Sequence, residues 1–362
     1  MKRIALSHDW LNGMRGGEKC LEVLCELYPD SDIFTLFHER GKVSETIARH
    51  PIHVSRVQNF PGATQWYRYY LPLFPVSIEA FDLKGYDLVI STSHCVAKGI
   101  KKAAGAVHIS YCFTPMRYAW ALFDDYFGRQ DGFSRAGINF FMNKLKDWDL
   151  KSNERVDHFV AISEHVRQRI KRFYQREAEV IYPPVDTDFY TPGQSSEKED
   201  FYLIVSALVP YKKIDAAIEA FNRLGKKLVI IGAGPEMGRL RKLAKRNVQF
   251  LGWQSDEALR NYYRKTKALI FPGEEDFGIV PVEIQACGGF VIALCKGGAL
   301  ETVNEGKTGL FFDGADNSSL DVAVERFEAG RWDGNQARQN ALRFGRERFK
   351  KEMKQIVDRV LA

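Results

Sequence analysis

Short apolar runs alternate along the 362-residue chain with segments whose apolar residues recur at helical spacing. Several runs are continuous, which is typical of strands buried on both faces of a parallel sheet that helices cover. In the first half the predicted strands are 3–8, 32–37, 52–57, 86–92, 106–112 and 158–163. In the second half they are 202–209, 227–233, 248–253, 268–272, 290–294 and 310–312.

Amphipathic helices are predicted between these strands. The segment Ile214–Phe221 places apolar residues at i, i+3, i+4 and i+7. Ser163 and Ser255 precede similar patterns and are expected to be helix N-caps. Strand–helix alternation in both halves predicts the α/β fold class, with two Rossmann-like, doubly wound parallel-sheet domains that face a central cleft.

A polar segment marks the boundary between the two predicted domains. Residues 191–200 (TPGQSSEKED) are rich in turn formers and poor in apolar residues, which is typical of a linker. We therefore expect domains at 1–190 and 191–345. Residues 335–361 form one long helical pattern with a break near Gly345, and its last part, about 346–362, is expected to pack back on the first domain.

An acidic motif follows the predicted strand 268–272. Pro281 is tolerated only in the first turn of a helix, so Glu275 is placed in the strand-to-helix loop and Glu283 inside the new helix. Because ligands of open parallel sheets bind at the carboxyl ends of strands, both carboxylates are expected at the cleft. A carboxylate accepts two hydrogen bonds from a ribose diol, although acidic residues also simply favour helix starts.

The backbone between the two glutamates is a second candidate. The N–H groups of Phe277, Gly278 and Ile279 lie at the predicted helix N-terminus, where an anion or a sugar hydroxyl can bind.

A diphosphate would need cations or exposed N–H groups. Lys212 and Lys213 follow one strand and precede a helix, so they are expected at the same end of the sheet. Gly16 and Gly17 follow the first strand and open a helix, which lets a phosphate approach the backbone. The Asp-x-Asp at 186–188 adjoins the linker and is interpreted as a turn, so we expect no metal and no cofactor.

Composition excludes some classes of protein. The formal net charge of +6 suits nucleic acid, anionic lipid or phosphorylated small molecules, but the basic residues show no nucleic-acid-binding motif. No apolar run approaches the roughly 18 residues of a membrane span, and the N-terminus lacks the apolar core of a signal peptide. We therefore expect a cytoplasmic protein with buried cysteine thiols, located in solution or at the inner face of the membrane.

The chain resembles glycosyltransferase family 4, retaining enzymes of the GT-B fold, over nearly its whole length. Glu275 to Glu283 matches the E-x7-E signature of that family, and other blocks occur in family order: 205–215, 232–236, 250–253 and 297–301. The first domain is similar to bacterial polysaccharide mannosyltransferases at 8–10, 13–19 and 114–120. The resemblance implies that Glu283 holds the donor ribose, Glu275 binds the donor sugar, and Trp253 and Gln254 flank the nucleobase.

Two departures from the family pattern change the expected site. Relatives often carry arginine where this chain has Ala207, followed by the lysine that Lys212 retains. Lys213, Arg15 or Arg117 would then supply the missing cation.

The second departure is Phe113, which stands where many relatives have a histidine that contacts the donor sugar. His94, after a neighbouring strand, is the candidate replacement. Phe113 would pack on a methyl group better than on a 6-hydroxyl, so the donor is expected to be GDP-mannose or a related sugar, including a 6-deoxy sugar.

The sequence thus predicts an enzyme that transfers a sugar from a nucleotide-diphosphate donor to a glycan or lipid-linked saccharide. Glu275, Lys212 and His94 are the expected residues at the reacting centre. The alternatives are a nucleotide-sugar epimerase of the same fold and a non-catalytic nucleotide- or glycan-binding protein. The aromatic, basic segment 66–75 is either packed core or a contact with a membrane surface.

Overall fold

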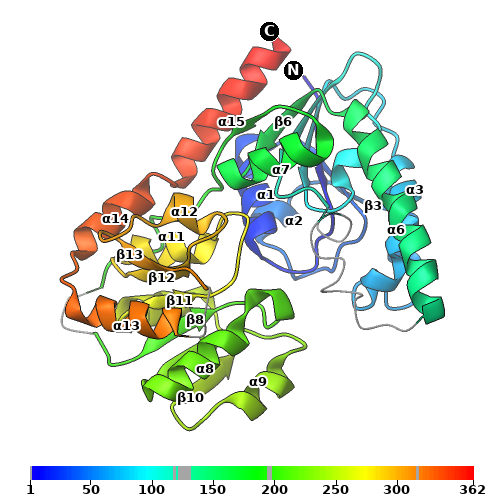
Figure 1. Ribbon diagram of the computed structural model, residues 1–362. Helices are drawn as coiled ribbons and strands as arrows, with labels where there is room; N and C mark the ends of the chain where they lie inside the picture. Colours follow the sequence, from blue (N-terminus) through cyan, green and yellow to red (C-terminus); the bar gives the residue numbers. More distant parts are fainter. Residues whose placement is uncertain (1, 117–119, 121–131, 194–197, 315–317) are drawn as a thin grey trace. The chain divides into compact units, whose positions relative to one another are not determined.

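The computed structural model describes residues 2–116, 120, 132–193, 198–314 and 318–362, without the side chains of Arg68 and 132–140. The chain divides into two compact units, one of Met1–Pro184 with Phe349–Ala362 and one of Val185–Arg348 (Figure 1). The division falls six residues before the boundary that the polar segment predicts, because residues 185–190 join the second unit.

The first unit is built on a seven-stranded parallel sheet in the order β3-β2-β1-β4-β5-β6-β7. The strands are β1 (Ile4–His8), β2 (Asp32–Thr35), β3 (Ile52–Val54), β4 (Leu88–Ser93), β5 (Val107–Cys112), β6 (His158–Ala161) and β7 (Ala178–Val180). The chain builds one side of the sheet from β1 and then returns to start the other side at β4. The topological switch point therefore lies between β1 and β4, where ligands of such sheets bind.

The helices of the first unit are α1 (Gly16–Leu27), α2 (Glu45–Ala48), α3 (Phe74–Glu79), α6 (Gly132–Ser152) and α7 (Glu164–Tyr174). Short 3₁₀ turns join them: η1 (Arg56–Asn59), η2 (Tyr67–Leu73), η3 (Ala97–Gly99) and η4 (Asn153–Arg155). The predicted N-cap is confirmed, since the Ser163 hydroxyl accepts a 3.0 Å hydrogen bond from the Val166 N–H. One face of the sheet packs on an aromatic core that includes Trp10, Phe37 and Phe74.

The second unit holds a six-stranded parallel sheet in the order β10-β9-β8-β11-β12-β13. Its strands are β8 (Tyr202–Val205), β9 (Leu228–Ile231), β10 (Val248–Gly252), β11 (Leu269–Phe271), β12 (Val291–Leu294) and β13 (Gly309–Phe312). All six coincide with predicted runs; five are shorter than predicted by one to four residues, and β13 begins one residue earlier. Here the switch point lies between β8 and β11.

The helices of the second unit follow their strands in the predicted alternation. They are α8 (Ile214–Leu224), α9 (Met237–Leu243), α10 (Asp256–Lys265), α11 (Ile279–Ala286), α12 (Ala299–Thr302), α13 (Ser319–Ala329) and α14 (Gly334–Leu342), with the 3₁₀ turn η6 (Pro210–Lys212). The apolar stripe predicted on Ile214–Phe221 is buried in the core, and Ser255 caps α10 by accepting from the Ala258 N–H at 3.3 Å.

The long C-terminal pattern is broken as predicted. Helix α14 ends at Leu342 and α15 (Arg346–Leu361) begins after Gly345. Most of α15 belongs to the first unit, where Lys350 forms a 3.1 Å ion pair with Glu26 and the Phe349 ring lies 5.4 Å from that of Tyr111.

The structure also bears on the cysteines and on membrane-spanning segments. All six cysteines lie among the described residues and are thiols; five are buried and Cys295 is exposed. No helix in the described ranges is long and apolar enough to cross a bilayer.

Candidate active site

Three loops of the second unit meet at its switch point, and glycines allow their backbones to touch. A Cβ atom on Gly273, after β11, would lie 2.9 Å from the Cα of Lys212, after β8. A Cβ on Gly298, after β12, would lie 2.3 Å from the Cα of Phe277. The Gly298 N–H also donates to the Glu275 carbonyl at 2.8 Å. Contacts between main-chain atoms therefore fix the position of the Glu275 backbone.

The side chains of Lys212 and Glu275 form an ion pair at this point. Both are largely covered, with 16% and 15% of the side chain exposed, so solvent screens the pair less than it would on an open surface. Lys213 follows directly, in the left-handed region with φ of 53°, and precedes the first residue of α8. A cation and a carboxylate from opposite sides of the switch point can together bind a ligand with phosphate and hydroxyl groups.

Glu283 lies in the second turn of α11 and is buried, with 5% of the residue exposed. The hydroxyl of Tyr263, on α10, donates to Glu283 Oε2 at 2.9 Å. Burial raises the pKa of Tyr263 well above its usual value, and the charge of Glu283 adds to this, so the phenol keeps its proton and remains a donor. Sequence reasoning missed Tyr263, because on a helix of apolar periodicity it resembles any other core aromatic.

Between the two glutamates the chain turns into α11 at Gly278, whose φ of +89° suits glycine. Phe277 is buried there and its ring lies edge-on to that of Phe344 at 5.5 Å. Ile279 begins the helix, so the three residues lie where the acidic motif places them.

The two residues expected to flank a nucleobase lie after β10, at the edge of the sheet. Trp253 is 78% exposed, and the Gln254 side chain donates to the Leu251 carbonyl at 3.0 Å. Strand β9 separates β10 from β8, so the structure does not bring these two residues against the Lys212–Glu275 pair.

In the first unit, the loops after β1 and β5 are in contact. Helix α1 begins at Gly16, and a Cβ on Gly17 would lie 3.3 Å from Phe113 Cε2 and 3.5 Å from His8 Cε1. Arg15 is exposed just before the helix, and its N–H donates to Glu18 Oε2 at 3.0 Å. Arg117, the remaining expected residue, lies outside the described residues.

His94 follows β4 at the same edge of the first sheet, and its ring centroid lies 6.4 Å from that of Phe113. Its Nδ1 lies 3.0 Å from Oδ2 of Asp9, a fully buried carboxylate. Burial alone would raise the pKa of Asp9, but the charge of His94 and its hydrogen bonds outweigh burial and hold that pKa at about 2. Asp9 is therefore ionised at neutral pH, and the sequence assigned it no role.

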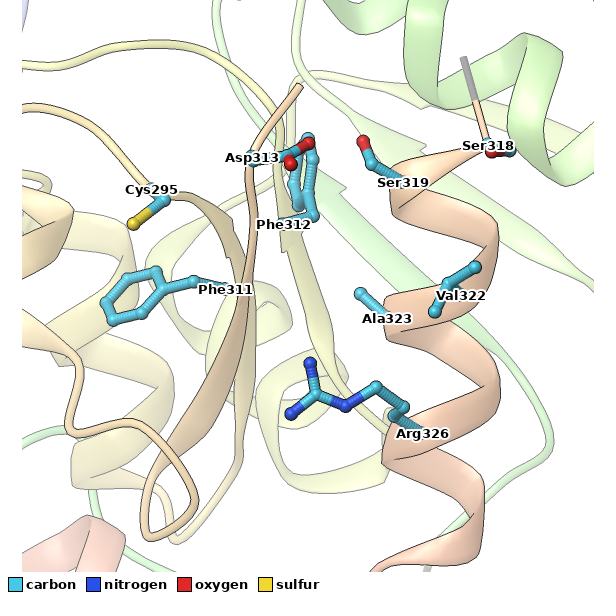
Figure 2. A pocket seen from close by; sticks show the side chains of 9 residues that line it. All are labelled: Cys295, Phe311, Phe312, Asp313, Ser318, Ser319, Val322, Ala323 and Arg326. Atoms are coloured by element: carbon cyan, nitrogen blue, oxygen red, sulfur yellow. The ribbon is translucent and has the colours of Figure 1, made fainter. Parts of the chain in front are cut away.

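A shallow hollow lies elsewhere in the second unit, between β13 and the start of α13 (Figure 2). Cys295, Phe311 and Arg326 are among the side chains around it. Strand β13 is the edge strand of its sheet, away from the switch point between β8 and β11, and none of the expected site residues lines this hollow. Topology therefore favours the Lys212–Glu275 region as the functional site.

In the part of the chain that the structure describes, no group of three or more His, Cys, Asp or Glu side chains is arranged to hold a metal ion.

Two family models match adjoining parts of the chain. The model for glycosyl transferases group 1 matches residues 188–347, and the model for glycosyltransferase family 4 matches residues 20–189. Together they cover both units, including Glu275, Glu283 and Lys212 in the second and His94 and Phe113 in the first. The chain belongs to glycosyltransferase family 4.

Curated relatives of this family 4 chain share about a third of their aligned residues with it. An uncharacterised glycosyltransferase of Methanocaldococcus jannaschii is 30% identical over 160 residues, 42% of this chain and 44% of that protein. A D-inositol 3-phosphate glycosyltransferase of Mycobacterium sp. (strain JLS) is 33% identical over 159 residues, 38% and 36% of the two chains. A GDP-mannose-dependent phosphatidylinositol monomannoside mannosyltransferase of Mycolicibacterium smegmatis is 31% identical over 193 residues, 45% and 50%. The chain thus spans half or less of these relatives.

Solved structures show that this family 4 chain has the GT-B fold. Sucrose-phosphate synthase from Thermosynechococcus elongatus aligns with a TM-score of 0.74 at 18% identity, over 100% of this chain and 99% of the other. Anabaena HepE in complex with UDP-glucose aligns with a TM-score of 0.72 at 16% identity, over 98% and 99%.

Proposed function

We propose that the protein is a retaining glycosyltransferase that moves a sugar from a nucleotide-diphosphate donor to a saccharide acceptor. The observation that carries this proposal is the Lys212–Glu275 ion pair, which three touching loops hold at the switch point of the second sheet. A nucleotide sugar offers the two groups that this pair can take, a diphosphate and sugar hydroxyls. Membership of glycosyltransferase family 4 supports the same reaction.

The donor is assigned to the second unit. Lys212, with Lys213 and the N-terminus of α11, would stabilise the negative charge that develops on the leaving diphosphate. Glu275 would accept hydrogen bonds from the transferred sugar, and Glu283, oriented by Tyr263, would accept those of the ribose diol. This arrangement stabilises the leaving group with protein groups, so the proposal includes no metal.

The acceptor and part of the donor sugar are assigned to the first unit, at the loops that carry Gly17, His94 and Phe113. We propose GDP-mannose or a related sugar as donor because the mannosyltransferase of M. smegmatis is GDP-mannose-dependent by name. The acceptor would be a glycan or lipid-linked saccharide of a bacterial surface polysaccharide.

Contact with a membrane surface is proposed from the first unit. Trp66, Tyr69 and Val76 lie on or beside η2 and α3 with 59%, 82% and 71% of the residue exposed. Aromatic side chains of this kind favour the interface of a bilayer, where a lipid-linked acceptor would be found.

A thermal-shift panel of GDP-, UDP- and dTDP-sugars tests the proposal, because a ligand that binds the folded state raises the unfolding temperature. The donor found in this way is then incubated with and without saccharide acceptors, with and without EDTA. A glycosyltransferase releases nucleotide only with an acceptor, apart from slow hydrolysis, whereas an epimerase converts the donor alone. Stabilisation by no nucleotide sugar would contradict the proposal, and loss of activity in EDTA that Mn²⁺ restores would contradict its metal-free form.

A further inference from the structure

The carboxylate of Asp9 is the centre of a hydrogen-bond network at the switch point of the first unit. Oδ2 accepts from the N–H groups of His94 and Cys95 at 2.7 and 2.9 Å, and Oδ1 accepts from those of Val96 and Ala97 at 2.7 Å each. Four backbone donors thus fix one fully buried side chain, and they fix the loop after β4 to the loop after β1.

The same carboxylate also determines the tautomer of His94. Nδ1 of the imidazole lies 3.0 Å from Asp9 Oδ2. An ionised carboxylate can only accept hydrogen bonds, so Nδ1 carries a proton and, in the neutral ring, Nε2 carries the lone pair. No described residue is hydrogen-bonded to that Nε2.

The surroundings hold the ring without covering it. Trp10, which is buried, meets the imidazole edge to face at a centroid distance of 4.6 Å. The side chain of His94 nevertheless stays 34% exposed. Ionisable groups that face the pair are His8 at the end of β1 and Cys95 after β4, and Glu18 on α1 acts on His8. Burial lowers the pKa of His8 and raises that of Cys95, so both are neutral near pH 7.

We infer that His94 binds a sugar hydroxyl through Nε2 and that Asp9 is the positioning residue that keeps the lone pair on that atom. This inference rests on the proposed function and names the group that recognises the saccharide. The hydroxyl belongs to the transferred sugar or to the acceptor, and both present the same hydrogen-bond donor.

Two substitutions of His94 separate the lone pair from the contact with Asp9. His94→Asn keeps an N–H near the position of Nδ1 and removes the acceptor. His94→Gln places an amide oxygen near the position of Nε2 and so keeps an acceptor there. His158→Asn is the matched control, because His158 is an exposed histidine at the opposite, amino end of a strand in the same sheet.

Calorimetry with GDP and GDP-mannose, and kinetics with GDP-mannose and methyl α-mannoside, then identify the hydroxyl. If it belongs to the donor, His94→Asn weakens GDP-mannose binding about tenfold and leaves GDP binding unchanged. If it belongs to the acceptor, both affinities stay unchanged and the KM for methyl α-mannoside rises about tenfold. His94→Gln stays within about threefold of the wild type, because its amide oxygen can accept the same hydrogen bond. Unchanged constants in His94→Asn, or equal losses in both variants, would overturn the inference.

A spectroscopic measurement tests the pairing of Asp9 with His94 and does not depend on an activity assay. In long-range ¹H–¹⁵N spectra of the full chain near neutral pH, His94 should show the Nδ1–H tautomer, and Asp9→Asn should shift it towards Nε2–H. An Nε2–H tautomer in the wild type overturns the inference, even where Asp9→Asn fails to fold. If no nucleotide sugar binds the wild type, the proposed function fails, while this spectrum still decides the role of Asp9.

Discussion

Two glutamates eight positions apart occupy different environments, although the sequence motif treats them alike. Glu275 faces the ammonium group of Lys212, whereas Glu283 is buried against the hydroxyl of Tyr263. A carboxylate that is paired with a cation, as Glu275 is, can exchange that partner for substrate. A carboxylate that accepts from a neutral hydroxyl, as Glu283 does, keeps its negative charge and a fixed orientation.

Glu283→Gln should weaken nucleotide binding and leave the fold intact. The amide can still accept from Tyr263, but it offers a ribose diol one acceptor oxygen and no charge. We expect a loss of about 1–3 kcal/mol in binding free energy, measured by calorimetry with GDP. Glu219→Ala, at an exposed position of α8, is the control. Unchanged nucleotide affinity in Glu283→Gln would exclude the ribose role.

Glu275→Ala should lower turnover more than donor affinity, since positioning of the sugar matters most in the transition state. The measurement is kcat beside the dissociation constant of the intact nucleotide sugar. A variant that loses affinity and keeps its turnover number would contradict this assignment.

Phe113→His should change the preference for the donor sugar. The Phe113 ring lies among those of His8, His94 and Tyr111, and it is an apolar group that can neither donate nor accept a hydrogen bond through a polar atom. A 6-hydroxyl that packs against this ring, and not against Nε2 of His94, would lack a partner, at a cost of roughly 1–3 kcal/mol. Wild type should therefore prefer a 6-deoxy donor over GDP-mannose in kcat/KM, and Phe113→His should relax that preference. A wild-type preference for the hydroxylated donor would refute the idea.

At the scale of elements, the pattern of apolar positions located the strands well. Twelve of the thirteen strands in the described residues coincide with predicted runs, because buried parallel strands are continuous apolar segments. Strand β7 was missed, since Ala178–Val180 is three residues long with a glutamate at its centre. Such a strand exists only because β6 supplies its hydrogen-bond partners.

The site could be predicted in part for the same reason. Local signals, a proline in the first helical turn and glycines after strands, place Lys212 and Glu275 in loops after strands and Glu283 in the helix that follows. Partners such as Tyr263 and Asp9 are set by packing between segments distant in sequence, which no local pattern encodes.

Gly298→Ala should disturb the loop that carries Glu275. Its new methyl group would meet the backbone of Phe277, which cannot move aside as a flexible side chain can. We expect a loss of about 1–3 kcal/mol in the free energy of unfolding, with reduced turnover. Gly238→Ala, on α9 with nothing within 4 Å of the added Cβ, is the control and should gain about 0.5–1 kcal/mol. Chemical denaturation of both variants measures the difference, and equal stabilities would show that the loop yields.

The exposed residues of η2 and α3 should attach the protein to lipid. Wild type should sediment with vesicles of phosphatidylglycerol and phosphatidylcholine, and the double variant Tyr69→Ser, Val76→Ser should bind about tenfold more weakly. Leu342→Ser, which removes a 40% exposed leucine of the second unit, serves as the control. If the wild type does not sediment with the vesicles, these residues are ordinary surface residues and the proposed membrane contact is wrong.

At the scale of the whole molecule, the division into two units decides how stability is measured. The first unit contains both ends of the chain, whereas the second unit is one continuous segment. The two units therefore need not unfold in a single transition. The first unit contains a buried titratable group that ties its stability to pH. His108 on β5 is fully buried, with Nε2 2.9 Å from Ser91 Oγ and Nδ1 3.1 Å from the Arg155 carbonyl. These partners suit a neutral imidazole whose Nδ1–H donates and whose Nε2 accepts.

Acidification should therefore begin to destabilise the first unit at pH values well above those at which carboxylates titrate. Burial lowers the pKa of His108 from 6.5 to about 4. Below pH 6.5 His108 is protonated in the unfolded chain but stays neutral in the folded chain. The free energy of unfolding therefore falls as the pH drops from 6.5 to 4. At pH 4.5 the loss from this group is about 2–3 kcal/mol. His108→Gln, which keeps a donor and an acceptor, should be less stable at pH 7.5 yet lose less stability on acidification. Urea unfolding at pH 7.5 and 4.5 measures the difference, with the exposed His158→Gln expected to follow the wild type. Equal acid losses in all three proteins would show that His108 is not the group that couples folding to pH.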